Sequence, residues 1–118
     1  MANKPVKSRI KKLIAALRSG KYRQTTGALR KGNRFCCLGV ACEVHRKATG
    51  KGRWRHIQGN WEYKKEISLL PTDVSKWFGI TRDPLLGGPS AASLNDMDKA
   101  DFPYIADQFE KTFIKPTL

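Results

Sequence analysis

The apolar residues near the start of the chain recur at helical spacing. Five of them fall on one face of a helix: Val6, Ile10, Leu13, Ile14 and Leu17. This pattern predicts a helix from about Pro5 to Ser19 that Gly20 closes. Asn3 or Ser8 is the candidate cap. The other faces carry lysine and arginine, so burying the apolar stripe leaves a basic outer surface.

Short apolar segments joined by glycine-containing loops predict two β-hairpins. Residues 28–30 and 34–37 flank the loop Lys31-Gly32-Asn33, and residues 54–58 and 61–64 flank Gly59-Asn60. In the second hairpin, aromatic side chains are expected to pair across the strands. The polar residues 24–27, which precede the first hairpin, predict a loop.

Three more helices are predicted further along the chain. The first is a short buried helix over residues 38–46 that stops before Gly50. The second begins at a Thr72 cap and stops at Gly79. The last begins at an Asp101 cap and repeats apolar residues as far as Phe113. Residues 81–90 hold two prolines and a Gly-Gly pair, which predicts a loop.

These elements together indicate an α+β fold. Their order predicts a small antiparallel sheet of hairpins packed against about four short helices. The 118 residues, with 40% hydrophobic content, suffice for one core without disulfides or metal. We therefore expect a single compact domain over residues 1–118.

Charge is distributed very unevenly along this domain. Residues 1–59 hold 16 Lys and Arg against one acid, Glu43, for a charge of +15, whereas residues 60–118 hold 7 against 9, for −2. The chain thus has a basic N-terminal part (1–59) and a near-neutral, helical C-terminal part (60–118). Because clustered cations repel one another unless an anion offsets them, we expect an anionic partner. A role in solubility alone is the alternative.

The most suggestive contact surface is the segment Lys51–His56, where cations alternate with glycine and an aromatic ring. A flat ring beside cations suits an unpaired base or a nucleotide next to its phosphate. Trp61 is instead expected in the core of the sheet, and His56 is expected to stack or hydrogen-bond. The predicted binding residues are Lys51, Arg53, Trp54, Arg55, Arg46 and Lys47, followed by Tyr22, Arg23, Arg30 and Arg34.

Three cysteines and a histidine lie close together in the sequence at positions 36, 37, 42 and 45. Their spacing lacks the paired CxxC knuckles of structural zinc sites, and the apolar string around them favours thiols packed as small core residues. A cysteine-dependent enzyme is another alternative. Glu43 and His45 are two residues apart on a helix and point in different directions, which disfavours it. We expect no metal, no cofactor and no catalytic residue.

Several stretches match a family pattern. The most specific are the string FCCLGVACE at residues 35–43 and the block formed by Leu94-Asn95-Asp96 with residues 102–110. Looser matches are residues 16–24, 27–29 and 70–79. In these the chain resembles a family of small proteins encoded mainly by tailed bacteriophages. The resemblance implies a phage origin and no catalytic residues, and small phage proteins of this size commonly act by binding.

The leading hypothesis is a non-enzymatic phage protein that counters host defence or host machinery through its basic half. Its partner would be an anionic target, either nucleic acid or a nucleotide immune signal. The alternative is an inhibitor that docks directly on an acidic surface of a host protein complex, such as a defence protein. The apolar run at residues 13–17 is too short for a signal peptide or a membrane span. We expect a monomer or homodimer in the cytoplasm of the bacterial host.

Overall fold

The front helix, α1 (Lys7–Arg18), supplies one side of the core. In the computed structural model, which describes residues 4–115, its buried residues are Ile10, Leu13, Ile14 and Leu17. These are four of the five residues of the predicted stripe. Val6 occupies the N-cap position without a side-chain hydrogen bond, so Ser8 is not the cap. The other predicted cap, Asn3, lies outside the described residues.

Helix α2 (Cys37–Thr49) lies at the centre of the molecule. Its residues 37–45 are all buried, and it ends at Gly50, which has the left-handed φ of 67° that glycine adopts readily. The prediction of a short buried helix with this stop is confirmed. α2 packs against α1, α3 (Thr72–Phe78) and α4 (Ala91–Asp96).

The later helices differ from the predictions in two details. Pro71, not Thr72, occupies the N-cap of α3 and makes no side-chain hydrogen bond. The six-residue helix α4 was not predicted, since it is too short to show a periodic stripe. The Asp101 cap of α5 (Phe102–Phe109) is confirmed, because its carboxylate accepts from the Tyr104 N–H. The chain continues from α5 into a π-helical turn, η1 (Glu110–Ile114).

Both predicted hairpins form, but as separate small sheets. Strands β2 (Arg30–Lys31) and β3 (Arg34–Phe35) are antiparallel, and β1 (Arg23–Gln24) adds to β3 in parallel. The second residue of β1, Gln24, was predicted as part of a loop. Strands β4 (Trp54–Ile57) and β5 (Asn60–Tyr63) form the second sheet.

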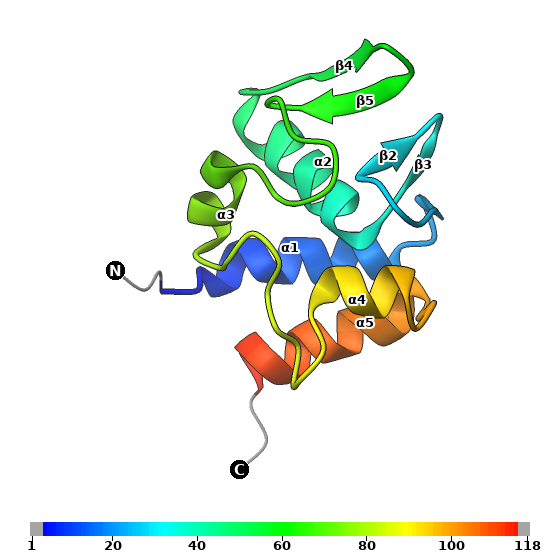
Figure 1. Cartoon of the computed structure of the whole chain (residues 1–118). Helices are drawn as coiled ribbons and strands as arrows, with labels where there is room; N and C mark the ends of the chain where they lie inside the picture. Colours follow the sequence, from blue (N-terminus) through cyan, green and yellow to red (C-terminus); the bar gives the residue numbers. More distant parts are fainter. Residues whose placement is uncertain (1–3, 116–118) are drawn as a thin grey trace.

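The two hairpins share one end of the molecule (Figure 1). They lie beside α2 and contact each other through β2 and β5, while α1, α4 and α5 form the opposite side. The α+β prediction is confirmed, and the buried apolar residues form one core cluster. Since β5 belongs to residues 60–118, the near-neutral part is not purely helical. It supplies one strand of the second hairpin, whose other strand belongs to the basic part. Within residues 4–115, no helix is both long and apolar enough to span a bilayer.

The buried Asn95 joins α4 to β1 and to the start of α2. Its Oδ1 accepts hydrogen bonds from Gln24 Nε2 at 2.8 Å and from the Cys37 N–H at 3.1 Å. Its Nδ2 donates to the Thr25 carbonyl at 2.8 Å. The side chain therefore fixes β1 and the start of α2 on α4. This contact gives a physical reason why the FCCLGVACE string and the Leu94-Asn95-Asp96 block occur together in the family pattern.

Candidate nucleic-acid interface

Strand alternation divides the predicted contact segment between two faces. Trp54 pairs with Tyr63 and His56 with Trp61 across the β4–β5 ladder, and Arg55 lies between them in the sequence. Because successive strand residues point to opposite faces, Arg55 is turned away from the Trp54 ring and is exposed. Arg55 therefore does not flank this ring. The cation beside it comes from the other hairpin.

Trp54 connects β4 to α2. Its ring is half buried and lies 5.1 Å from the Tyr63 ring and 5.7 Å from the Phe35 ring, centroid to centroid. Its Nε1–H donates to Glu43 Oε2 at 2.9 Å. Since these neighbours occupy much of the indole, Trp54 holds the second hairpin on α2 and is a poor platform for a ligand base.

Glu43, the single acid of the basic part, is used within the fold. Arg46 donates from Nε to Oε2 at 2.7 Å and from a terminal nitrogen to Oε1 at 3.2 Å. Burial alone would raise the pKa of Glu43, but the hydrogen bonds from Arg46 and Trp54 outweigh it and lower the pKa. Arg46 is thus largely neutralised internally, which weakens it as a candidate for ligand contact.

Arg30, on the first hairpin, is the cation at the centre of the aromatic cluster. Its guanidinium carbon lies 3.7 Å from the Trp61 centroid, 5.4 Å from Phe35 and 5.5 Å from Trp54. Its Nε donates to the Gly32 carbonyl at 2.6 Å. The side chain is half buried, and this burial lowers its pKa. Arg30 was only a second choice among the predicted binding residues, because no local pattern indicates a contact between the hairpins.

A hollow of about 330 Å³ opens between the two hairpins. Its lining includes Arg30, Lys31 and Gly32 from the first hairpin and His56, Asn60 and Trp61 from the second. The His56 ring stacks on Trp61 at 4.7 Å with an interplanar angle of 13°, so the predicted stacking role of His56 is confirmed. Trp61 is half buried beside this hollow and not in the core, which corrects its prediction. The signal for this contact in the sequence is the register of the second hairpin, which pairs His56 with Trp61 across the strands.

A second hollow, of about 300 Å³, lies where α1 meets α2. Lys47 Nζ donates to the Tyr22 hydroxyl at 2.9 Å, and Lys12 lies beside them. The hydrogen bond to Tyr22 raises the pKa of Lys47. The cation at Tyr22 is therefore Lys47, which is distant in sequence. The Tyr22 ring meets Phe35 edge-on at 5.6 Å, which fixes its orientation.

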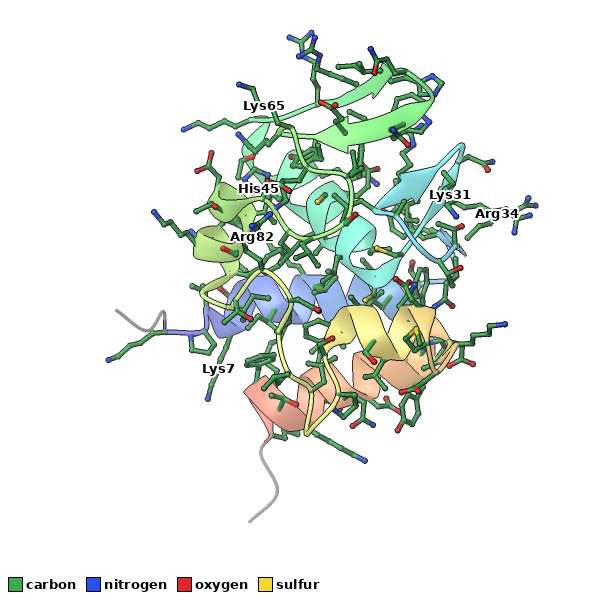
Figure 2. All side chains as sticks on the ribbon, in the orientation of Figure 1. Lys7, Lys31, Arg34, His45, Lys65 and Arg82 are labelled. Atoms are coloured by element: carbon green, nitrogen blue, oxygen red, sulfur yellow. The ribbon has the colours of Figure 1, made fainter. Side chains whose placement is uncertain are left out.

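The remaining predicted residues are exposed and scattered over the hairpins and the segments leading into them. Figure 2 shows Lys31 and Arg34 extending from the β2–β3 hairpin on one side of the molecule. Of the 16 Lys and Arg in residues 1–59, only Arg18 and Arg46 form an ion pair with a carboxylate in the described part of the chain. The exposed residues of this group are Lys51, Arg53, Arg55, Arg23 and Arg34.

The thiols of Cys36, Cys37 and Cys42 are buried and free, as predicted for core packing. Burial raises the pKa of Cys36 to about 12 and raises those of the other two well above their ordinary value. His45 is also buried, and its Nδ1 lies 2.8 Å from the Tyr63 hydroxyl. Over residues 4–115, no three Cys, His, Asp or Glu side chains gather as metal ligands would.

A family model described as "Domain of unknown function (DUF8296)" matches residues 6–113. The chain belongs to this family. No curated protein and no solved structure matches the chain. The DUF8296 match spans α1 to α5, so both hairpins and both hollows lie inside the family domain.

Proposed function

We propose that this DUF8296 protein binds nucleic acid through its basic half and has no catalytic activity. The observation that carries the proposal is that 14 of the 16 cations in residues 1–59 have no carboxylate partner within the described chain. Unpaired lysines and arginines release counterions when they neutralise phosphates, which drives binding independently of sequence. Phosphate contacts are expected to dominate over contacts to base edges.

The distribution of exposed apolar side chains favours nucleic acid over an acidic protein partner. A protein interface obtains most of its affinity from a buried apolar or aromatic centre. The large exposed apolar residues of the described chain are Ile67, Leu85, Met97 and Tyr104. Only Ile67 borders the surface formed by the two hairpins, so few fully exposed apolar side chains are available there to a protein partner.

The resemblance to tailed-phage proteins supplies the setting of the proposal. Within it, the protein counters host defence or host machinery by occupying nucleic acid or by sequestering a nucleotide signal in the host cytoplasm. The burial of all three thiols and their raised pKa values support a binding role, because a catalytic cysteine must be accessible as thiolate.

The proposal is tested by fluorescence anisotropy with labelled DNA at increasing salt. We expect a linear fall of log affinity with log salt, and a slope that is shallower by about 0.7–0.9 for each phosphate contact removed. The double variant R53Q/R55Q should lower affinity and flatten the slope.

The matched control is K99Q/K111Q, which removes the same charge from exposed positions in the near-neutral part. It should bind with at most a small loss. Equal losses in the two double variants would show that net charge alone governs binding. Absence of binding to any nucleic acid at low salt, with an acidic host protein captured stoichiometrically, would favour the alternative partner.

A further inference from the structure

We propose that the hollow between α1 and α2 holds one backbone phosphate of a nucleic-acid strand, bound by Lys12, Lys47 and the Tyr22 hydroxyl. The inference rests on the proposed binding of nucleic acid and names one place where a phosphate is held. Three observations carry it: a lysine ammonium held against a hydroxyl, a second lysine in the same hollow, and a lining of small apolar side chains between them.

Helical spacing turns the lining residues of this hollow towards one another. Lys12 and Ala16 are four residues apart on α1, and α2 contributes Val44, Lys47 and Ala48, which are three or four apart. Side chains at these spacings share one face of a helix. The hollow therefore lies between two rows of side chains, each of which contributes one lysine.

Lys47 and Tyr22 supply hydrogen-bond donors at one point. Lys47 Nζ donates to the Tyr22 hydroxyl oxygen at 2.9 Å. An ammonium group has three N–H donors, so two remain, and the hydroxyl keeps its own proton for another acceptor. The Tyr22 ring meets Phe35 edge-on, with 5.6 Å between the centroids, which keeps the hydroxyl in place. A phosphate at this point can accept hydrogen bonds from both groups at once.

The two lysines of the hollow lack an acidic partner. Neither Lys12 nor Lys47 forms an ion pair with a carboxylate of the described chain. Glu43 attracts Lys47 through space, but its carboxylate already accepts hydrogen bonds from Arg46 and Trp54. Two ammonium groups around one hollow repel each other, and an anion bound between them offsets that repulsion.

The lining of the hollow matches a phosphodiester better than a base. Its polar groups are two ammonium groups and one hydroxyl, which offer donors to the acceptor oxygens of a phosphate. The small side chains of Ala16 and Ala48 let the sugars on either side of the phosphate approach the helices. The volume of about 300 Å³ is at the lower limit of about 300–1,000 Å³ for sites that enclose a small molecule. A phosphate within a strand needs no such enclosure.

The decisive variant is Y22F, which removes the hydroxyl and leaves both the net charge and the aromatic ring in place. We expect it to lower the affinity for a labelled DNA duplex about three- to ten-fold, as the loss of one net hydrogen bond does. Fluorescence anisotropy measures the loss. The matched control is Y104F, which removes a hydroxyl from an exposed position on α5 and should bind like wild type.

A second pair of variants tests the lysine on the other helix. K12Q removes a cation that lines the hollow, and K11Q removes the neighbouring exposed cation of α1, which does not line it. K12Q should make the slope of log affinity against log salt shallower by about 0.9, the value for one phosphate contact to duplex DNA. K11Q should leave the slope unchanged. Circular dichroism of each variant shows whether the fold is retained.

Inorganic tripolyphosphate, titrated by calorimetry, is the second ligand and separates this inference from the proposed function. If Y22F binds DNA like wild type, or if K12Q and K11Q change the slope equally, the phosphate site is overturned while nucleic-acid binding stands. If wild type binds tripolyphosphate more tightly than Y22F does and neither binds DNA, the hollow is a phosphate site and the proposed function fails. If wild type binds neither ligand, or only tripolyphosphate and as tightly as Y22F, both are overturned.

Discussion

His45 is the buried titratable side chain whose protonation the fold resists. Burial is the main cause of its lowered pKa, and Lys64 and Arg9 add to the effect while Asp73 opposes it. Its Nδ1 lies against the Tyr63 hydroxyl, which itself donates to the Lys51 carbonyl at 3.5 Å. The neutral imidazole thus anchors the segment that leads into β4.

This environment makes stability depend on pH in a defined direction. The pKa of His45 is lower in the folded state than the ordinary value of 6.5, so its contribution is complete above that pH. It is lost as the pH falls from 6.5 through the folded pKa, because the unfolded chain binds the proton first. We expect the melting temperature to fall from pH 7 to pH 5 more steeply in wild type than in H45Q, measured by circular dichroism at about 0.15 M salt. Parallel slopes in the two proteins would contradict this account.

At the same scale, the roles of some residues were predictable from the sequence and those of others were not. Burial of the cysteines followed from the apolar string around them, and the stacking of His56 followed from its neighbours. The contact of Arg30 with Trp61 joins two hairpins, and the hydrogen bond of Asn95 with Gln24 joins α4 to β1. No local pattern specifies contacts of this kind, since they depend on how the elements pack.

At the scale of elements, α2 lies unusually close to the segment before β2. A Cβ on Gly39 would lie 1.9 Å from the carbonyl oxygen of Leu29, which is a backbone atom that cannot move aside alone. That carbonyl also accepts a hydrogen bond from the Cys36 N–H at 3.1 Å. The absence of a side chain at Gly39 is therefore what allows the first hairpin to dock on the helix.

Substituting this glycine should be among the most damaging single changes in the chain. We expect G39A to lower the free energy of unfolding by at least about 3 kcal/mol, the range of severe overpacking. Urea denaturation followed by tryptophan fluorescence measures the loss. The control is G50A, where a Cβ meets open space and only the left-handed φ is unfavourable, so a loss of about 1 kcal/mol is expected. A milder effect at position 39 than at position 50 would refute the close-packing argument.

Long periodic elements were predictable, whereas very short ones were not. Helices α1 and α5 show their apolar stripes directly in the sequence, and both hairpins are marked by their turns. Strand β1 has two polar residues, and α4 has six residues after a loop. Both are held by tertiary bonds, such as that of Gln24 to Asn95, and not by their own propensity.

For the whole molecule, the dominant feature is a net charge of +13 with few internal ion pairs on the basic half. Exposed cations at this density repel one another, which destabilises the compact state in the absence of an anion. The repulsion acts over the Debye length, so salt reduces it. The free protein is therefore expected to be less stable at low ionic strength than its core packing alone would allow.

Raising the salt concentration should stabilise the protein. We expect the melting temperature to rise between about 10 mM and about 150 mM sodium chloride, where the Debye length falls from about 30 Å to about 8 Å. A polyphosphate at matched ionic strength should raise it further, because it binds the folded basic surface preferentially. Differential scanning fluorimetry provides the measurement. A melting temperature that is insensitive to both additions would mean that the cations are too dispersed to interact.

The three cysteines are free and buried in the core beneath the two hairpins, with Cys37 and Cys42 fully buried and Cys36 only 5% exposed. An alkylating reagent therefore finds no target until that interior opens, and each opening event becomes a permanent chemical mark. The rate of thiol labelling therefore measures how often the core opens. Comparing the labelling rates with and without ligand would show how far binding at the two hairpins suppresses opening of the core.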